Sequence, residues 1–310
     1  MAQSSRTALL RLGTRGSPLA LYQARTVRDR LVAAHDLAPE AVEIRVIRTS
    51  GDRITDRPLA DAGGKGLFVK EIEEALLAGE IDLAVHSCKD VPALLPPGLA
   101  LVACLEREDV RDAFICPTAR TIAELREGAV VGTSSPRRQA LLLRLRPDIR
   151  IAPLRGNVDT RLRKIAEGEA DATLLALAGL KRLGLQRHAA SVLPVEEFPP
   201  AGGQGAIGIE TRDDDTRTRS LLEGIDHRDT SVALAAERAF LAVLDGTCRT
   251  PIACHAQVKG AQLTLHGMIV RPDGSEVHAA TRTGASADAA ALGADAGREL
   301  KSRASSDFFA

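Results

Sequence analysis

The sequence predicts an α/β protein in which two similar lobes surround a cleft and a small α+β domain follows. A strand, a glycine-containing turn and a helix with proline at its start occur in this order twice, near Gly13–Pro18 and near Gly132–Pro136. A helix that ends at a glycine and leads into a strand also occurs twice, at Gly79 and at Gly168. From about Asp226 the pattern becomes different. Because strands that alternate with helices are typical of parallel sheets, we expect parallel sheets in both lobes.

The first strand–turn–helix unit begins with a short strand at residues 8–12, and its helix extends from Pro18 to about residue 34. The helical period is carried by Leu19, Ala20, Gln23, Val27 and Leu31. In the second unit the strand Val130–Val131 precedes a helix that extends from Pro136 through Leu145. Proline suits the first helical position and a preceding serine suits the N-cap, so both turns are expected to present serine at a helix start.

A long loop, Thr49–Gly66, separates a strand of the first lobe from the helix expected at Phe68–Leu77. Loops of this length are usually functional or mobile, and we expect a lid over the cleft. The strand Ile81–Val85 follows this helix. Ligand sites in open α/β sheets lie beyond the carboxyl ends of strands, which places residues 86–90 at the cleft.

The tail predicts a separate α+β domain. A helix is expected at Thr230–Leu244, then strands at Ile252–Lys259, Leu263–Val270 and Val277–Thr283, and a closing helix at about Ala287–Ser302. The chain has 310 residues, which suggests two or three domains. We expect a first lobe formed by residues 1–105 and 201–223, a second lobe formed by residues 106–200, and a third domain formed by residues 226–310.

Composition excludes several classes of protein. The 41 basic and 41 acidic residues leave no net charge, and aromatic residues make up only 2%, so a nucleic-acid-binding protein is not expected. No apolar run approaches the roughly 20 residues of a membrane span, and the N-terminus lacks the apolar core of a secretory signal. The five cysteines form no C-x-x-C pair. We therefore expect free thiols and a cytoplasmic protein.

The second lobe is locally basic, and several of its cations lie where strands meet helices. Arg137 and Arg138 follow a helix start, and Arg155 precedes the possible cap Asn157. Helix N-termini and arginines both bind anions, so these positions predict a site for carboxylates or phosphates. The run Gly203–Gly208 fits G-x-G-x-x-G but lacks the strand–turn–helix context of a dinucleotide site, and no phosphate-binding loop occurs. Carboxylates are therefore expected, rather than phosphates, as the ligands of these arginines.

Two further segments could carry chemistry. Lys89 and Asp90 follow a strand; Asp90 could act as an acid or base or stabilise a developing cation, and a structural Lys–Asp pair is equally compatible. Cys248 lies in a turn beside Arg249, where a thiol is more accessible than in a core. The sequence has no metal-binding spacing and no G-x-S-x-G elbow, so neither a metal site nor a serine hydrolase is expected.

Together these segments resemble the porphobilinogen deaminase (hydroxymethylbilane synthase) family. The matching stretches occur in family order: Thr14–Ala20, Gly63–Phe68, Val85–Pro92, Gly132–Gln139, Leu154–Asn157, Gly179–Gly184, Gly203–Ala206 and the turn that holds Cys248. The resemblance implies two lobes like those of periplasmic binding proteins plus a third domain. It also implies a transferase that joins four porphobilinogen molecules head to tail into hydroxymethylbilane, releases ammonia and serves haem biosynthesis.

The resemblance further implies a role for individual residues. Cys248 would hold a dipyrromethane cofactor by a thioether, Asp90 would be the catalytic carboxylate, and Lys65 would belong to the lid. The remaining matches would bind acetate and propionate groups: Arg15, Ser17, Ser87, Lys89, Thr133, Ser135, Arg137, Arg138, Arg155, Arg161 and Arg182. A monomer that needs only its small-molecule substrate is expected, with no obligate protein partner, nucleic acid or membrane.

The sequence departs from the family pattern around the proposed attachment turn, where Thr247 and Arg249 replace the more frequent glycine and glutamine. Gly16 and Cys88 also differ from common family residues. A solute-binding protein for polycarboxylates would share the two lobes, but it would have an export signal and no third domain with a cysteine. A basic RNA-binding module is opposed by the neutral charge and the scarce aromatics.

Overall fold

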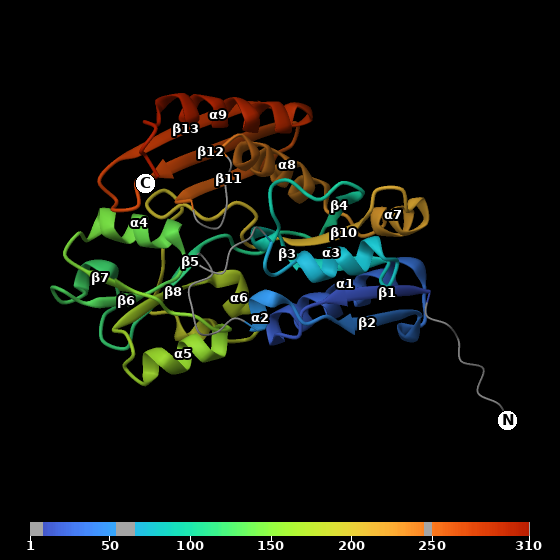
Figure 1. The fold of residues 1–310 in the computed structure, drawn as a ribbon, viewed down its shortest axis with the longest axis horizontal. Helices are drawn as coiled ribbons and strands as arrows, with labels where there is room; N and C mark the ends of the chain where they lie inside the picture. Colours follow the sequence, from blue (N-terminus) through green and yellow to red (C-terminus); the bar gives the residue numbers. More distant parts are fainter. Residues whose placement is uncertain (1–8, 54–65, 245–249, 310) are drawn as a thin grey trace.

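The computed structural model describes residues 9–53, 66–244 and 250–309. They form two α/β lobes and a smaller third unit, which lies above both lobes in Figure 1. Cys248 and Lys65, to which the family resemblance assigns attachment of the cofactor and a place in the lid, lie outside the described residues. Among the described residues no helix is long and apolar enough to cross a membrane.

The first lobe contains a five-stranded sheet in the order β2-β1-β3-β10-β4. Its strands are β1 (Leu10–Thr14), β2 (Val42–Val46), β3 (Leu83–Ser87), β4 (Leu99–Cys104) and β10 (Ile207–Arg212). Its helices are α1 (Pro18–His35), α2 (Ser50–Arg53), α3 (Lys70–Leu77) and α7 (Thr216–Glu223). Leu83, Val85 and Ile209 point to the core under α1, whereas Ala84 packs with Ile72 of α3 on the other face.

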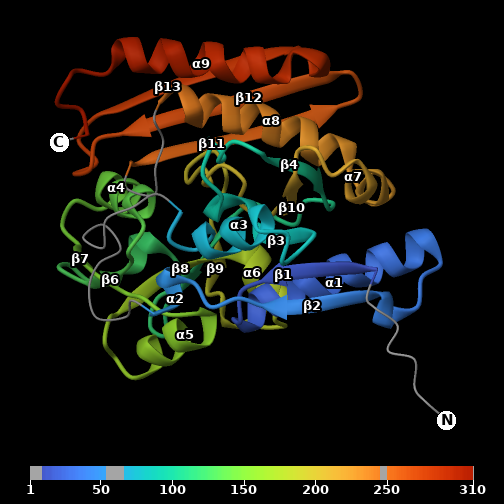
Figure 2. The ribbon, with the colours of Figure 1, turned by 45° about the vertical axis from the view of Figure 1, so that its right-hand side comes forward.

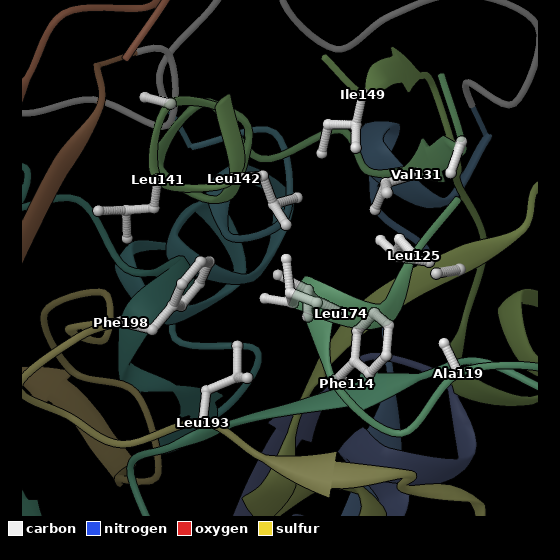
Figure 3. Packing of buried hydrophobic residues seen from close by; sticks show 14 of the residues in the cluster. Phe114, Ala119, Leu125, Val131, Leu141, Leu142, Ile149, Leu174, Leu193 and Phe198 are labelled. Carbon is white, nitrogen blue, oxygen red and sulfur yellow. The ribbon is translucent and has the colours of Figure 1, made fainter. Parts of the chain in front are cut away.

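The second lobe repeats this arrangement in the order β7-β6-β8-β5-β9. Its strands are β5 (Asp112–Ile115), β6 (Val130–Gly132), β7 (Arg150–Ala152), β8 (Ala172–Ala176) and β9 (Ser191–Val192). Its helices are α4 (Pro136–Leu145), α5 (Val158–Ala166) and α6 (Leu177–Arg182). Figure 3 shows the core between the sheet and α4, where Phe114 and Leu174 of the sheet lie near Leu142, and Phe198 packs beside Leu141.

The expectation of parallel sheets is confirmed for three strands of each sheet and was wrong for one strand in each. In each sheet the fourth strand runs antiparallel to its neighbours: β10 pairs antiparallel with β3 and β4, and β5 pairs antiparallel with β8 and β9. These two strands are also the first ones after the chain passes from one lobe to the other. They enter the sheet from the opposite lobe and therefore run in the opposite direction. The other neighbouring strands, β2-β1-β3 and β7-β6-β8, are parallel as expected.

The third unit is a three-stranded antiparallel sheet with two helices. The strands β11 (Ile252–Lys259), β12 (Gln262–Val270) and β13 (Val277–Ala285) follow one another in the sheet. The helices α8 (Arg228–Val243) and α9 (Ala289–Arg303) pack side by side on it, as Figure 2 shows. Phe240 of α8 lies against Gly267, where a Cβ would come within 2.5 Å of its ring. The predicted α+β tail is therefore confirmed.

Helix starts near the functional region follow the sequence rules. Ser17 caps α1 by accepting a hydrogen bond from the Ala20 amide at 3.3 Å, and Asn157 caps α5 by accepting one from the Thr160 amide at 2.9 Å. Ser135 caps α4, and Pro18 and Pro136 occupy the first positions of their helices. In place of part of the predicted loop Thr49–Gly66 the structure has the short helix α2. The rest of that loop up to residue 65 lies outside the described residues.

Candidate functional site

A pocket lies beyond the ends of β1 and β3, which are parallel neighbours and therefore end at the same edge of the sheet. It is lined by residues from the turn after β1, from α1, from the segment before α3 and from the end of β3: Arg15, Ser17, Leu19, Ala20, Gln23, Phe68, Val69, Val85, His86, Ser87 and Asp90. We call it the first-lobe pocket. Four site residues predicted from the sequence, Arg15, Ser17, Ser87 and Asp90, meet there.

Polar contacts fix several walls of the first-lobe pocket. The Arg15 guanidinium lies over the Phe68 ring, 4.2 Å from its centroid, which is a cation–π contact. The Gln23 side-chain amide donates to the Ser87 hydroxyl at 2.8 Å. Gln23 is only 2% exposed, so this pairing also satisfies a buried polar side chain. The pocket thus presents a guanidinium and hydroxyls, which suit a carboxylate, beside an aromatic face.

Lys89 and Asp90 lie on the single 3-10 turn Cys88–Asp90 that follows β3. The second passage between the lobes packs against this turn. Gly203 has φ 77°, and a Cβ there would come within 2.8 Å of the Lys89 backbone nitrogen. The Cys88 amide also donates to the Ala206 carbonyl at 3.0 Å. The glycine therefore allows the crossover to hold the turn that carries Lys89 and Asp90.

Cations of the second lobe face this turn. Lys89 and Asp90 are both exposed residues. Even so, many protein atoms lie around the ammonium group at the tip of the Lys89 side chain. Burial lowers the pKa of Lys89 to about 8. Asp90 and Asp112 oppose the shift, and Arg138 and Arg161 add to it. Burial also lowers the pKa of Arg161 to about 10, with the charges of Arg138 and Arg155 acting in the same direction and that of Asp90 opposing.

Lys89, Arg138, Arg155 and Arg161 therefore form one group of mutually repelling cations around Asp90, which we call the cationic cluster. Asp90 belongs both to this cluster and to the first-lobe pocket. A polycarboxylate that extends from the pocket across the cluster would relieve the repulsion among these cations. Side chains from both lobes therefore lie around one carboxylate, Asp90.

Arg137 and Arg138 are held more tightly than the sequence suggested. Both are buried, and Asp112 at the start of β5 accepts from Arg137 Nη2 through one oxygen and from Arg138 Nη2 through the other, each at 2.7 Å. Their Nη1 atoms donate to the carbonyls of Pro199 and Leu174. Although burial alone would raise it, the two guanidinium charges hold the pKa of Asp112 well below its usual range. The Nε atoms of both arginines are buried without a hydrogen-bond partner.

The remaining predicted residues occupy different surroundings. Thr133 is buried, and its hydroxyl accepts from the Ser135 amide at 3.2 Å, while the Ser135 hydroxyl accepts from the Arg138 amide at 3.4 Å. Arg161 donates through Nε to the Gly156 carbonyl at 2.8 Å. Arg182 donates to the Gly205 carbonyl at 2.6 Å, so it contacts the second crossover. Among the described residues no group of acidic, histidine or cysteine side chains has the arrangement of a metal site.

Sequence reasoning missed several residues that shape the site. Gln23 is a polar residue within the apolar stripe of α1, and this position could have indicated a side chain with a polar partner in the site. Phe68 and His86 belong to segments that were recognised, but no role was assigned to them. Asp112 and Gln204 could be identified only from the fold, because their partners are distant: the Gln204 amide donates to the Val110 carbonyl at 2.7 Å and to Asp112 at 3.1 Å.

The chain is similar over nearly its whole length to proteins of one family. Residues 10–220 match the family model described as "Porphobilinogen deaminase, dipyromethane cofactor binding domain", and residues 232–302 match the model of the C-terminal domain of the same enzyme. The porphobilinogen deaminase of Nitrobacter hamburgensis is 60% identical over 310 residues, which cover 100% of this chain and 98% of the relative. That of Paracoccus denitrificans is 56% identical over 300 residues, 97% of this chain and 96% of the relative.

Solved structures show a weaker likeness. A nutrient-binding protein from Burkholderia cenocepacia bound to methionine has a TM-score of 0.43 and 13% identity, and the match covers 69% of this chain and 90% of that one. The methionine-binding protein MetQ has a TM-score of 0.44 and 15% identity over 76% of this chain and 95% of its own. On the strength of the family models and the full-length relatives, the chain belongs to the porphobilinogen deaminase family, transferases that join porphobilinogen units into a linear tetrapyrrole on a dipyrromethane cofactor.

Proposed function

We propose that Asp90 is the catalytic carboxylate of porphobilinogen polymerisation in this chain. One observation carries the proposal: Asp90 is the acidic residue that lines the first-lobe pocket and also lies among the cations of the cationic cluster. An incoming porphobilinogen in the pocket and a growing chain on the cluster would then meet at Asp90. Porphobilinogen is accordingly the small-molecule substrate that we propose for the pocket.

The residues present fit a dipyrromethane. Two pyrroles carry four carboxylates between them. Lys89, Arg138 and Arg161 supply clustered positive charge, and Asp90 and Asp112 are the negative charges that oppose it among the described residues. The buried Nε atoms of Arg137 and Arg138 lack a partner, so each arginine still has a donor. When bound, the dipyrromethane supplies the free pyrrole carbon at which the chain grows. Arg138, Arg155, Arg161 and Lys89 would hold its carboxylates, with Thr133 and Ser135 at the start of α4.

The first-lobe pocket would bind and orient the incoming molecule. Arg15 and Ser17 would take its carboxylates, with Ser87 held in place by Gln23. As the bond between the aminomethyl carbon and nitrogen breaks, positive charge develops on the substrate, and the anionic Asp90 would stabilise it electrostatically. Fixed carboxylates in a partly desolvated pocket act more strongly on such a charge than water does. Asp90 would therefore accelerate the loss of ammonia.

We propose Cys248 as the attachment residue and Lys65 as part of a lid, on the family resemblance alone, since both lie outside the described residues. We also propose the domain boundaries 1–105 with 201–223, 106–200 and 226–310, because β10 completes the first sheet after the second crossover. A cytoplasmic location is proposed as well. The four described cysteines are free thiols, as is usual in a reducing compartment.

Mass spectrometry of the denatured protein tests the proposed function. Active protein should exceed its sequence mass by two pyrrole units, and peptide mapping should place this mass on the peptide that contains Cys248. The Cys248→Ser variant should have the bare sequence mass, whereas Cys116→Ser should keep the added mass. An active wild-type protein with the bare sequence mass would refute the proposed attachment of a dipyrromethane to Cys248.

A further inference from the structure

A buried cluster of acidic and histidine side chains lies beneath the first-lobe pocket and is not used by the chemistry proposed above. In the antiparallel pair β3–β10, His86 is opposite Gly208 and Ala84 is opposite Glu210. Residues two apart on a strand share a face, so His86 and Glu210 are diagonal neighbours on one face of the sheet. Their side chains meet, with His86 Nε2 3.0 Å from Glu210 Oε2.

The helix α3 covers the same face and adds a second carboxylate, as its place beside β3 and β10 in Figure 1 illustrates. Glu73 of α3 is 8% exposed, His86 5% and Glu210 0%. Glu73 Oε1 and Glu210 Oε1 are both buried without a hydrogen-bond partner. Two carboxylates with buried, unpartnered oxygens are costly if both are ionised, and a proton on one of them removes most of that cost.

The charges around Glu73 come from each element packed on it. The pKa of Glu73 is raised to about 7, chiefly by burial, and the negative charges of Glu210 on β10 and of Glu74 on its own helix act in the same direction. His86 on β3 opposes the shift. Arg238 of α8 faces Glu210 and donates to the Ala93 carbonyl at 2.9 Å. Glu73 therefore changes its charge within the physiological range, whereas an ordinary glutamate is ionised throughout it.

The cluster is joined to the pocket through His86. His86 lines the first-lobe pocket together with Asp90, Arg15 and Ser87, while its Nε2 faces Glu210 on the opposite side. A change of charge at Glu73 therefore reaches the pocket floor as an electrostatic effect on Glu210 and on His86, which are in contact with each other. Neither Glu73 nor Glu210 lines the pocket, so both would act on the reaction only through His86 and through their electric field.

We propose that Glu73, acting through Glu210 and His86, is a proton-binding positioning residue that sets the charge beneath the porphobilinogen pocket and so couples turnover to pH. The inference rests on the proposed function of that pocket. When Glu73 is protonated, the floor has one negative charge fewer. When Glu73 releases its proton, the added negative charge favours both the ammonium group of the substrate and the positive charge that develops as ammonia leaves. Turnover should therefore rise as the pH passes upward through about 7.

The test compares ammonia release at pH 6 to 8.5 in the wild-type holoenzyme, Glu73→Gln and Glu74→Gln. Glutamine has the shape of a protonated glutamate, so Glu73→Gln should equal the wild type at pH 6 and fall below it on the order of three- to tenfold at pH 8.5, as expected for one buried charge at an effective dielectric constant of about 20. Glu74→Gln removes a charge from the next, exposed position, where Glu74 lies 3.8 Å from Lys70. It should keep the rise of activity with pH, with the midpoint displaced only slightly to lower pH, because the charge of Glu74 is a minor cause of the raised pKa of Glu73.

A spectroscopic measurement makes the test independent of turnover and of how well the variant folds. Infrared difference spectra of the wild-type protein between pH 6 and 8.5 should show a protonated carboxyl band that disappears as the pH rises, and this band should be absent from Glu73→Gln and present in Glu74→Gln. A rise of activity near pH 7 that persists in Glu73→Gln, or a wild type without such a band, would overturn the inference and leave the proposed function intact. A wild type that releases no ammonia from porphobilinogen at any pH would instead refute the proposed function.

Discussion

Arg107 and Glu237 form a buried two-pronged ion pair between the first crossover and the third unit. Arg107 Nη1 lies 2.7 Å from Glu237 Oε1, and Nη2 lies 3.1 Å from Oε2. Arg107 also donates through Nε to the Gln204 carbonyl, and Glu237 accepts from the amides of Gly203 and Ala256. One pair thus links both crossovers between the lobes to α8 and β11.

We predict that Arg107→Ala lowers the free energy of unfolding by about 3–5 kcal/mol, because it leaves the Glu237 carboxylate buried without its counter-charge. Urea unfolding followed by circular dichroism measures this. Arg111→Ala is the matched control, since Arg111 pairs with Asp109 at 2.7 Å on the surface, and should cost less than about 1 kcal/mol. If the free energy of unfolding fell equally in both variants, the buried pair would contribute no more to stability than a surface pair.

The second crossover needs glycine at position 205. Gly205 has φ 87°, and a Cβ there would come within 2.3 Å of the Glu108 carbonyl oxygen. Gly184 has a similar φ of 68°, but a Cβ added at Gly184 would have no neighbouring atom within 4 Å. We predict that Gly184→Ala costs only the backbone strain of about 1–2 kcal/mol, whereas Gly205→Ala costs clearly more. Thermal unfolding of the two variants separates strain from the clash, and a smaller loss in Gly205→Ala would contradict this account.

Local signals in the sequence predicted the helix starts and the turn that carries the candidate catalytic residue. Ser17, Ser135 and Asn157 are caps because each lies within three residues of the amide it binds, so a short window of sequence contains the whole interaction. The glycines that follow α3 and α5, Gly79 and Gly168, have φ 67° and 79°, as the helix-ending pattern predicted.

Interactions over long separations were not predictable in this way. Arg137 and Arg138 were expected to bind anions, and nothing nearby in the sequence indicated that Asp112, more than 20 residues earlier, would bind both. The direction of β5 and β10 was missed for the same reason. The direction of these two strands depends on the chain passing from one lobe to the other. The pattern of hydrophobic residues contains no information on this passage. The buried Glu73–Glu210 relationship likewise exists only once α3 is placed on the sheet.

Lys89 precedes Asp90, which lines the first-lobe pocket, so loss of the Lys89 charge should weaken binding of the porphobilinogen carboxylates as well as those of the cofactor. The low pKa of Lys89 therefore predicts a pH limit for substrate binding. Lys89 should lose its charge as the pH rises through about 8, since burial lowers its pKa to that value. The KM for porphobilinogen should therefore increase above pH 8 in the wild type. Lys89→Arg keeps a charge at all these pH values and should have a flat KM, whereas Lys89→Gln should have a raised KM already at pH 7. Steady-state kinetics from pH 7 to 9.5 measure this, and a parallel rise in Lys89→Arg would exclude Lys89 as the titrating group.

Asp112 should stabilise the second lobe at neutral pH. Its pKa in the folded protein lies well below its usual range, so its contribution is present above the unfolded pKa of about 3.9 and disappears as the pH falls through the folded value. We predict that Asp112→Asn costs about 3–5 kcal/mol at pH 7, because Arg137 and Arg138 remain buried without their carboxylate. Asp148→Asn, which breaks the surface pair with Arg146, should cost far less. Urea unfolding at pH 7 compares them.

Asp90 is predicted to be needed for turnover and not for folding. Asp90 is exposed to solvent at the end of a 3-10 turn, so Asp90→Asn removes a charge without opening a cavity in the core, and the nearby cations Lys89 and Arg161 lose one opposing charge. Loss of an oriented charge beside a developing cation typically costs on the order of 10²–10³ in rate, and ammonia release should fall by that factor.

Asp159→Asn, an exposed change in the first turn of α5, is the control and should leave the rate unchanged. The unfolding temperature of both variants should match the wild type, which separates a catalytic loss from a structural one. Wild-type ammonia release by a folded Asp90→Asn would mean that another group stabilises the charge on the substrate, and the part assigned to Asp90 would then be wrong.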